Sequence, residues 1–424
     1  MLMIAPYFVP RRRVGAQRPF KFAIHLEKFG WKPTVITIAD QNQDLSANEK
    51  RLLKEVEIIE VKPPFDRTTN QSSVKAVKQE ENKKKGMADR LSNWIDKQVP
   101  MDTWFFFFLL NYRTIQKKSE ELSPDIIWST GDPWSGHWLG EKLSENLSVP
   151  WIADFRDPWT LSELSLRHRS AFSEKLDRKY ESRFIKKADK LIFTSQQTSN
   201  IYKEHYKLSE YKTETIYNSF DPNLFPETKK TVWSADIDEK KFNIFFFGKF
   251  RRLSPIEPIL QSVKKLEEMD AEKADNLLIH SFGIPDEDQL KLIREHNAEK
   301  YFDFHDPVLP ELTIPVLKKA DLLFLSTDPS RKNIIPAKLW DYLATGIPIL
   351  SVAPNPEISD ILSKSASGEQ FDPDNLTGIS NYIIELMADG KMAKKAVTSG
   401  VSDFTTESSA EKLALIMDDL TSDG

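Results

Sequence analysis

The chain has 424 residues, of which 40% are apolar and 29% charged, so its composition is globular and its length suits two or three domains. It contains no cysteine, which excludes disulfide frameworks, thiolate zinc sites, iron–sulfur clusters and cysteine nucleophiles. Its net charge of -5 provides no basic field for DNA or RNA, and we expect no nucleic-acid partner.

Short apolar runs alternate with amphipathic helical stretches through the first half of the chain. The runs predict strands at residues 2–5, 34–38, 125–128, 151–153 and 190–193. Between them, apolar residues recur with helical spacing at Phe20, Ala23, Ile24 and Phe29, and later at Leu139, Leu143 and Leu147. Apolar strands separated by helices indicate a parallel sheet that is covered on both faces.

One segment of the first half departs from this alternation. Residues 66–90 are rich in charge and poor in large apolar residues, which predicts a flexible excursion inside the first domain. An aromatic segment follows, with Leu91, Trp94 and Ile95 and then the apolar run 104–110. Two interpretations are open: a helix pair buried against the sheet, or a partly exposed apolar surface for a lipid-linked substrate or a membrane face.

The alternation begins again in the second half. Strands are predicted at residues 242–247, 277–279, 321–325 and 347–352, with one helix face at Ile259, Leu260, Val263 and Leu266. We therefore predict an α/β chain with two Rossmann-like, doubly wound domains facing across a cleft, over residues 1–222 and 223–405, and a C-terminal helix over 406–424 that packs back on the N-terminal domain. Such sheets bind ligands at the carboxyl ends of their strands, so functional loops are expected there.

The apolar runs also bear on localisation. The longest, at 104–110, is far shorter than the roughly 20 residues that cross a bilayer. No basic segment precedes the apolar stretch 2–5, and the arginines 11–13 follow it, so no signal peptide is predicted. We expect a cytoplasmic protein, with peripheral contact at the inner face of a membrane as one consequence of the aromatic segment.

A charged helix start stands out at residues 333–348, N-I-I-P-A-K-L-W-D-Y-L-A-T-G-I-P. Pro336 precedes the predicted helix, and Lys338 and Asp341 share one face of it because they are three residues apart. A cation at a helix N-terminus is favourable when an anion is bound there. The pair suits a nucleoside diphosphate, with Lys338 on phosphate and Asp341 accepting from ribose hydroxyls.

This motif resembles the retaining glycosyltransferases of family 4, which have the GT-B fold. In that family an acidic pair spaced Glu-x7-Glu lies near the cleft, and its first acid helps to hold the donor sugar. Here the second acid corresponds to Asp341, and Asn333 stands in place of the first. The resemblance implies a transferase that moves a sugar from a nucleoside-diphosphate donor to a hydroxyl group of a glycan, polysaccharide or lipid-linked acceptor, with retention. Because of Asn333, a catalytically inactive GT-B scaffold stays open as an alternative, as does a GT-B nucleotide-sugar epimerase.

A second basic segment follows the predicted strand 242–247. Gly248, Lys249, Arg251 and Arg252 form a glycine turn with cations, which is typical of phosphate binding, and a solvated basic loop is the alternative. The resemblance places Lys249 at a family arginine and Arg251 or Arg252 at a family lysine, both on the donor diphosphate. It also places residues 280–283 and 305–308 near the base.

The resemblance assigns acceptor-side roles in the first half. His137 matches a histidine that approaches the reacting sugar, and the segment D-F-R-D-P-W at 154–159 supplies Asp157 as a second catalytic candidate. A structural histidine and an ion pair of Arg156 with Asp154 or Asp157 are the alternatives. Gly15 and Arg18 match the loop that follows the first strand, and the arginines 11–13 either contact an acceptor phosphate or are solvated.

Several sharper motifs are missing from the sequence. There is no G-x-G-x-x-G after the first strand, no Walker loop and no G-x-S-x-G. Three Asp-x-Asp sequences, at 236–238, 286–288 and 372–374, lie in polar stretches and are interpreted as solvated. We therefore expect neither a cofactor nor a catalytic metal, with a nucleotide sugar and its acceptor as the partners.

Overall fold

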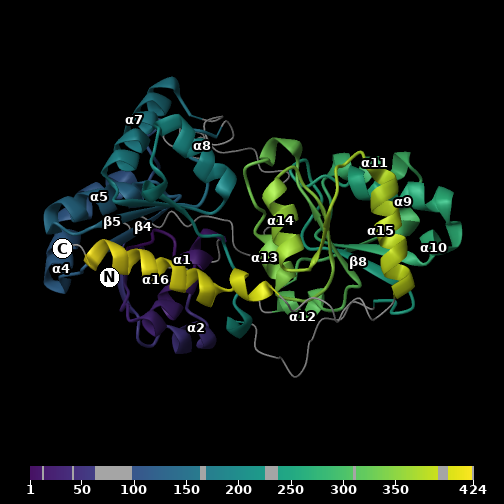
Figure 1. Cartoon of the computed structure of the whole chain (residues 1–424), viewed down its shortest axis with the longest axis horizontal. Helices are drawn as coiled ribbons and strands as arrows, with labels where there is room; N and C mark the ends of the chain where they lie inside the picture. Colours follow the sequence, from purple (N-terminus) through teal and green to yellow (C-terminus); the bar gives the residue numbers. More distant parts are fainter. Residues whose placement is uncertain are drawn as a thin grey trace. The chain divides into compact units, whose positions relative to one another are not determined.

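The computed structural model describes residues 1–11, 14–40, 43–62, 98–162, 169–224, 237–308, 312–389 and 400–422. The chain forms two compact units, one of Met1–Asn218 with Thr406–Gly424 and one of Ser219–Thr405 (Figure 1). The excursion predicted at 66–90 lies outside the described residues, and so do Leu91, Trp94 and Ile95.

The first unit is built on a seven-stranded sheet with the order β3-β2-β1-β4-β5-β6-β7, in which all neighbouring strands are parallel. Its four central strands are buried at every position, although threonine, serine and aspartate interrupt their apolar residues. The strands are β1 (Leu2–Ile4), β2 (Thr34–Ile38), β3 (Glu57–Val61), β4 (Ile127–Gly131), β5 (Trp151–Phe155), β6 (Lys190–Phe193) and β7 (Thr213–Thr215).

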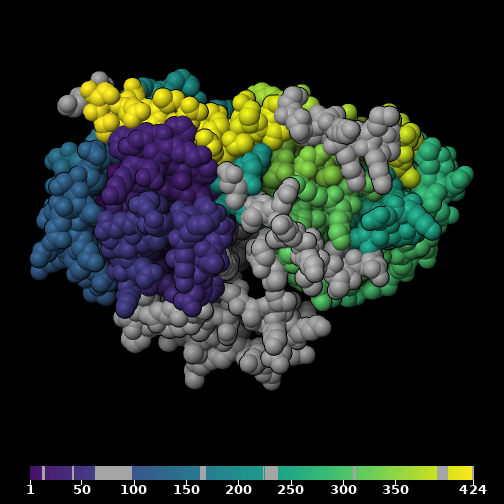
Figure 2. Space-filling model, turned by 90° about the horizontal axis from the view of Figure 1, so that it is seen from below, coloured from purple at the N-terminus to yellow at the C-terminus, as the bar shows by residue number. Residues whose placement is uncertain are grey.

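Helices flank this sheet, and one of them comes from the far end of the chain. They are α1 (Val14–His25), α2 (Ala47–Leu52), α4 (Phe105–Leu122), α5 (Ser135–Leu147), α7 (Ala171–Lys187), α8 (Gln196–Tyr206) and α16 (Thr406–Ser422). Figure 2 shows the yellow atoms of α16 against the purple N-terminal residues. Lys28 Nζ lies 2.7 Å from Glu407 Oε2, and Trp31 donates to Asp418 over 2.9 Å. The C-terminal helix is thus part of the first unit.

The apolar run at the start of α4 is divided between two faces. Phe105, Phe107 and Phe108 are buried in the core, whereas Phe106, Leu109 and Leu110 are 50%, 48% and 80% exposed. The buried residues agree with a helix packed in the core, and the exposed residues leave an apolar face on the same helix. Contact of that face with a lipid-linked substrate or a membrane stays a prediction. No helix within the described residues is both long enough and apolar enough to cross a bilayer.

The second unit has a six-stranded parallel sheet with the order β10-β9-β8-β11-β12-β13. Its strands are β8 (Phe242–Phe246), β9 (Leu277–Phe282), β10 (Phe302–His305), β11 (Leu322–Ser326), β12 (Ile349–Val352) and β13 (Gly368–Gln370). The flanking helices are α9 (Glu257–Met269), α10 (Ala271–Asp275), α11 (Glu287–Glu295), α12 (Thr313–Leu317), α13 (Lys338–Leu343), α14 (Pro356–Lys364) and α15 (Leu376–Asp389).

Both sheets have the strand order of doubly wound, Rossmann-like folds, which confirms the predicted α/β class. In each sheet the winding direction reverses between two central strands, β1 and β4 in the first unit and β8 and β11 in the second. Ligands of such sheets bind outside the carboxyl ends of the strands at this reversal. The loops that follow these strands are therefore the places to look for a site.

The chain passes between the units at two neighbouring places. Phe220 forms a parallel bridge with Thr405, and its N–H donates to the carbonyl of Phe404 over 3.3 Å. The division falls at Ser219, a few residues before the boundary predicted from composition.

Candidate functional site

In the second unit, α13 is fixed to the carboxyl edge of the sheet by one buried tyrosine. The hydroxyl of Tyr342 donates to the carbonyl of Phe324 on β11 over 3.1 Å and accepts from the N–H of Phe247, just after β8, over 2.9 Å. These strands flank the reversal of the winding direction. The helix that carries the charged motif is thereby placed where a doubly wound sheet binds its ligand.

Lys338, the first residue of α13, directs its ammonium to the end of β8. Its Nζ lies 3.8 Å from the centroid of the Phe246 ring. A Cβ added at Gly248 would lie 3.2 Å from that Nζ, and Gly248 has a φ of +116°, which favours glycine. Glycine therefore provides both the turn after β8 and the space in which the lysine lies.

The charge of Lys338 is not balanced within the protein. Among the described residues its ammonium has no carboxylate or hydrogen-bond partner, and its contact is the aromatic ring. Burial, followed by the charges of Arg251 and Arg331, lowers the pKa of Lys338 from 10.5 to about 7. An anion bound beside Lys338 would offset its repulsion by the two arginines, so this end of β8 favours a bound anion.

The other cations of this region are arranged differently. Lys249 Nζ lies 2.6 Å from Asp286 Oδ1, and both side chains are about half exposed. Arg252 is exposed, and its charge acts on Asp328, whose pKa is lowered chiefly by hydrogen bonds from Ser330. The arginine that acts on Lys338 is Arg251, not Arg252.

The remaining residues of the charged motif lie beside Lys338 in the sequence and are partly exposed: Asn333, Pro336 and Asp341. Arg331 precedes them in a short 3-10 turn, Pro329–Arg331, which the sequence motif did not include. The hydroxyl of Ser281 bonds to the carbonyls of Gly248 and Gly283 over 2.9 and 2.8 Å, which ties the loops after β8 and β9 together. Arg331 lies just outside the predicted motif. Tyr342 and Ser281 lie within the ranges 333–348 and 280–283, but their hydrogen bonds were not predicted because they join residues that are far apart in the sequence.

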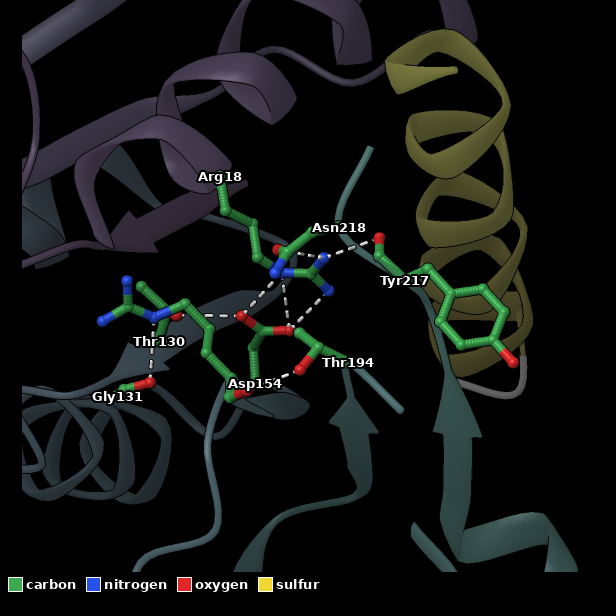
Figure 3. Close-up of polar contacts among 8 residues, drawn as sticks. Arg18, Thr130, Gly131, Asp154, Thr194, Tyr217 and Asn218 are labelled. Atoms are coloured by element: carbon green, nitrogen blue, oxygen red, sulfur yellow. Dashed lines mark hydrogen bonds and ion pairs between the residues drawn. The ribbon is translucent and has the colours of Figure 1, made fainter. Parts of the chain in front are cut away.

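In the first unit, polar side chains meet at the ends of β4, β5 and β6 (Figure 3). Asp154, which is fully buried, accepts from Thr130 Oγ1 over 2.8 Å and pairs with Arg18 Nη2 over 2.8 Å. Arg18 also donates to the carbonyl of Tyr217 over 3.0 Å and contacts Asn218 Oδ1 over 3.4 Å. Arg18, predicted in the acceptor loop, thus forms a buried ion pair that holds the segment leading out of this unit.

Arg156 pairs with a different carboxylate from the one anticipated. Its Nη2 lies 3.0 Å from Asp132 Oδ1, and its Nε donates to the carbonyl of Gly131 over 3.0 Å. The alternative in which Arg156 pairs with Asp154 is therefore wrong, because Arg18 occupies that carboxylate. A Cβ at Gly15 would lie 2.1 Å from Arg156 Nη1, so glycine lets the start of α1 pass the guanidinium.

The rest of the acceptor-side set is partly described. Asp157 follows Arg156 and is exposed. Arg11 is buried and donates to the carbonyl of Ala39, whereas Arg12 and Arg13 lie outside the described residues.

His137 is a buried, neutral imidazole in the first turn of α5. Its Nδ1 lies 2.8 Å from Ser129 Oγ, which accepts from Trp151 Nε1 over 2.8 Å. The serine hydroxyl is then free to donate to Nδ1, which leaves the ring proton on Nε2, and Nε2 has no partner among the described residues. Burial and the charge of Arg156 lower the pKa of His137 to about 3. The side chain is therefore a hydrogen-bond donor at neutral pH.

Two family models match adjoining parts of the chain. The model described as Glycosyltransferase Family 4 matches residues 20–224, and the one described as Glycosyl transferases group 1 matches residues 227–401. No curated protein matches the sequence.

Solved structures resemble the chain over its full length. A sucrose-phosphate synthase from Thermosynechococcus elongatus has a TM-score of 0.66 at 15% identity, with 100% of this chain and 99% of that one covered. A glycosyltransferase from Rickettsia africae has a TM-score of 0.60 at 15% identity, covering 100% and 98%. HepE of Anabaena, in complex with UDP, has a TM-score of 0.55 at 15% identity, covering 100% and 97%. At these identities the likeness shows the fold, which is the predicted GT-B architecture.

Proposed function

Because the chain belongs to the family-4-like glycosyltransferases, we propose that it moves a sugar from a nucleoside-diphosphate donor to a hydroxyl group of a glycan or lipid-linked acceptor. We further propose that the transfer proceeds with retention of configuration and without a catalytic metal. The second unit would hold the donor and the first unit the acceptor. The observation that carries the donor assignment is the unbalanced ammonium of Lys338.

The cations at the end of β8 supply the chemistry that a diphosphate leaving group requires. Lys338, Arg251 and Arg331 would neutralise the charge that develops on the β-phosphate, the role that a divalent ion has in metal-dependent transferases. Because Lys338 has a pKa of about 7 in the empty protein, the arriving diphosphate would raise that pKa and draw a proton onto the amine. Asp341, one turn further along α13, would accept from the ribose hydroxyls.

The acceptor side rests on His137 and Asp157. The Nε2–H of His137, which has no partner among the described residues, would donate to a hydroxyl of the donor sugar or the acceptor, and the lowered pKa of the ring keeps it neutral near pH 7. The exposed carboxylate of Asp157 follows β5 and is the second candidate on this side. Gly15 and Arg18 would contribute through the loop shape, since Arg18 is paired with Asp154.

The first experiment is a thermal-shift titration with UDP, GDP, ADP, CMP and their common sugars, with and without EDTA. A ligand at one hundred times its Kd stabilises the folded protein by about 2.7 kcal/mol. Asp341→Ala should weaken the best nucleotide by about 1.5–3 kcal/mol, whereas Asp374→Ala, an exposed carboxylate in a polar turn, should leave it unchanged. An unchanged Kd for a folded Asp341→Ala variant would defeat the ribose assignment, and no shift by any nucleotide would defeat the donor site.

A second candidate is a GT-B scaffold that binds a nucleotide sugar without turnover, and Asn333 favours it. The amide lacks the charge of the family acid that helps to hold the donor sugar. Nucleotide binding without product from any donor, together with turnover in Asn333→Glu, would establish this candidate. Conversion of the donor sugar in the absence of any acceptor would instead identify an epimerase.

We also propose that the exposed face of α4 meets a lipid-linked acceptor at the cytoplasmic membrane surface. Phe106, Leu109 and Leu110 are exposed, and Arg113 and Lys117 continue the same face at helical spacing. Leu110→Glu should no longer sediment with anionic vesicles. Leu415→Glu, which changes a similarly exposed leucine on α16, should sediment as the wild type does. Equal sedimentation of the two variants would contradict the proposal.

A further inference from the structure

Two histidines and an aspartate face one another at the edge of the second sheet. His280 lies on β9, and Asp303 and His305 lie on β10. His280 Nδ1 is 2.8 Å from His305 Nε2, and Asp303 Oδ2 is 3.8 Å from the first nitrogen and 3.6 Å from the second. The three ligand atoms all lie within 4.8 Å of one another. None of these side chains has a part in the proposed transfer.

The pairing of β9 and β10 dictates this arrangement. Asp303 is the register partner of His280, so the two side chains lie on the same face of the parallel sheet. His305 follows Asp303 by two residues and returns to that face because side chains alternate along a strand. All three groups are thus held by regular strands and not by a loop, which fixes their separation.

A neighbouring amide orients His280 toward the cluster. Asn243 Nδ2 donates to the carbonyls of Asp238 and Lys241 over 3.1 and 2.8 Å, which assigns its oxygen to the other side. That oxygen lies 2.9 Å from His280 Nε2, so the ring proton is on Nε2 and the lone pair of Nδ1 points at His305. A metal-ligating histidine is usually held through one nitrogen by an oxygen acceptor, as His280 is, and Nδ1 of His280 would exchange its hydrogen bond with His305 for the ion.

We propose that His280, Asp303 and His305 bind a divalent transition-metal ion. The nitrogens of His280 and His305 lie 2.8 Å apart in a direct hydrogen bond, whereas two metal–nitrogen bonds of 2.0–2.1 Å at the tetrahedral angle separate the nitrogens by about 3.3 Å. The two rings would therefore move apart by about 0.5 Å and turn as the ion enters. Two imidazoles and one carboxylate on one side of an ion leave its other positions open, and they suit Zn²⁺, Co²⁺, Ni²⁺ or Fe²⁺ better than Mg²⁺ or Ca²⁺. The proton that His305 carries on Nε2 would leave that nitrogen, for solvent or for the other ring nitrogen, when the ion binds.

Burial and charge in the cluster agree with coordination. His280 is fully buried, the side chain of His305 is 10% exposed, and that of Asp303 is 46% exposed. The carboxylate can therefore turn onto the ion while solvent reaches the open positions.

An ion here would join the edge strand β10 to β9 and support the loop of the donor site. The rings of His305 and Phe282 stack with their centroids 5.1 Å apart. The centroid of the Phe282 ring lies 5.7 Å from that of Phe247, the residue before Gly248. Binding of the folded form alone would stabilise this unit by mass action. The inference stands on the cluster itself and does not depend on the proposed transferase activity.

The test uses the full chain after EDTA treatment, with Co²⁺ and Zn²⁺ as the probes and no nucleotide present. Co²⁺ should give a visible absorption band that saturates at one ion per chain, and Zn²⁺ should displace it and raise the melting temperature. Asp303→Asn, on the exposed side of the cluster, should retain the fold and lower the affinity at least tenfold. His305→Asn should do the same, while Asp306→Asn, an exposed neighbour outside the cluster, should bind as the wild type does.

Two results would overturn the proposal. One is the absence of a Co²⁺ band and of Zn²⁺ stabilisation at submillimolar metal in the wild type. The other is equal affinity of Asp303→Asn and Asp306→Asn, which would place the bound ion elsewhere. Neither result bears on the donor site, whose test is nucleotide binding in the presence of EDTA.

Discussion

Replacing Lys338 by methionine should have opposite effects on stability and on nucleotide binding. Methionine keeps the length of the side chain and its contact with the Phe246 ring but removes the ammonium. The empty protein no longer has to hold an unbalanced cation beside Arg251 and Arg331, so it should become more stable. The diphosphate loses a charge-assisted contact, so its affinity should fall by about 1.5–3 kcal/mol, roughly ten- to 150-fold.

The stability gain follows from the lowered pKa of Lys338. A decrease from 10.5 to about 7 corresponds to a cost of about 5 kcal/mol for keeping the charged form in the folded state. The side chain is partly exposed, and solvent screening should leave roughly half of this. The cost is complete below pH 7, and it decreases from pH 7 to 10.5 because the unfolded chain then binds a proton that the folded chain has lost. Wild-type stability should therefore rise with pH across this window relative to the variant.

The assay compares the thermal unfolding of the wild type and Lys338→Met at pH 6 and pH 9, and then titrates both with the nucleotide identified in the panel. At pH 6 the variant should melt at least about 5 °C higher, with a smaller difference at pH 9. Lys249→Met is the matched control, because Lys249 is half exposed and paired with Asp286. The melting temperature of this variant should differ little from that of the wild type. A variant at Lys338 that melts lower than the wild type at pH 6, or binds nucleotide equally well, would refute the reasoning.

Three further predictions concern residues that hold the two sites. Arg18→Met should cost about 3–5 kcal/mol in urea unfolding, because Asp154 keeps its bond from Thr130 but is left buried without a charged partner. Adding Asp154→Asn should recover part of this loss, and full stability of the single variant would contradict the ion pair. Because the pKa of His137 is about 3, the free energy of unfolding of the wild type should fall as the pH drops from 6.5 toward 3, by about 2 kcal/mol at pH 5. His137→Gln should remove this dependence on pH, and equal dependence in the two proteins would show that the ring is not buried as described. Tyr342→Phe should lose about 1–3 kcal/mol in thermal unfolding and weaken nucleotide binding, because a buried N–H after β8 loses its acceptor; an unchanged melting temperature would argue against that bridge.

The sequence predicted the central strands of both sheets and missed all four edges. Every strand expected from an apolar run is present, from β1 to β12, because strands buried on both faces are rich in apolar residues. The missed strands β3, β7, β10 and β13 have the sequences EIIEV, TET, FDFH and GEQ, and each is the outermost strand of its sheet. An edge strand is partly solvated, so it needs few apolar residues and resembles a loop in sequence.

The candidate site was predictable where its residues are close in sequence. Lys338 and Asp341 lie in one short motif, and the structure holds their helix at the sheet edge. The partner of Arg156 could not be predicted, because Asp132 and Asp154 follow neighbouring strands and local spacing does not choose between them. Long-range pairing of this kind depends on the strand order, which local patterns do not contain.

Charge balance distinguishes the two sheet edges and bears on which one takes the nucleotide. At the edge of the first unit the arginines have carboxylate partners within the same unit, Arg18 with Asp154 and Arg156 with Asp132. Those charges are already compensated, so they shape loops and gain little from a phosphate. At the edge of the second unit Lys338 has no such partner among the described residues, and its pKa is lowered first by burial and then by the repulsion of two arginines. A dianionic diphosphate would relieve that repulsion, so the unit with the uncompensated charge is the one from which we expect nucleotide affinity.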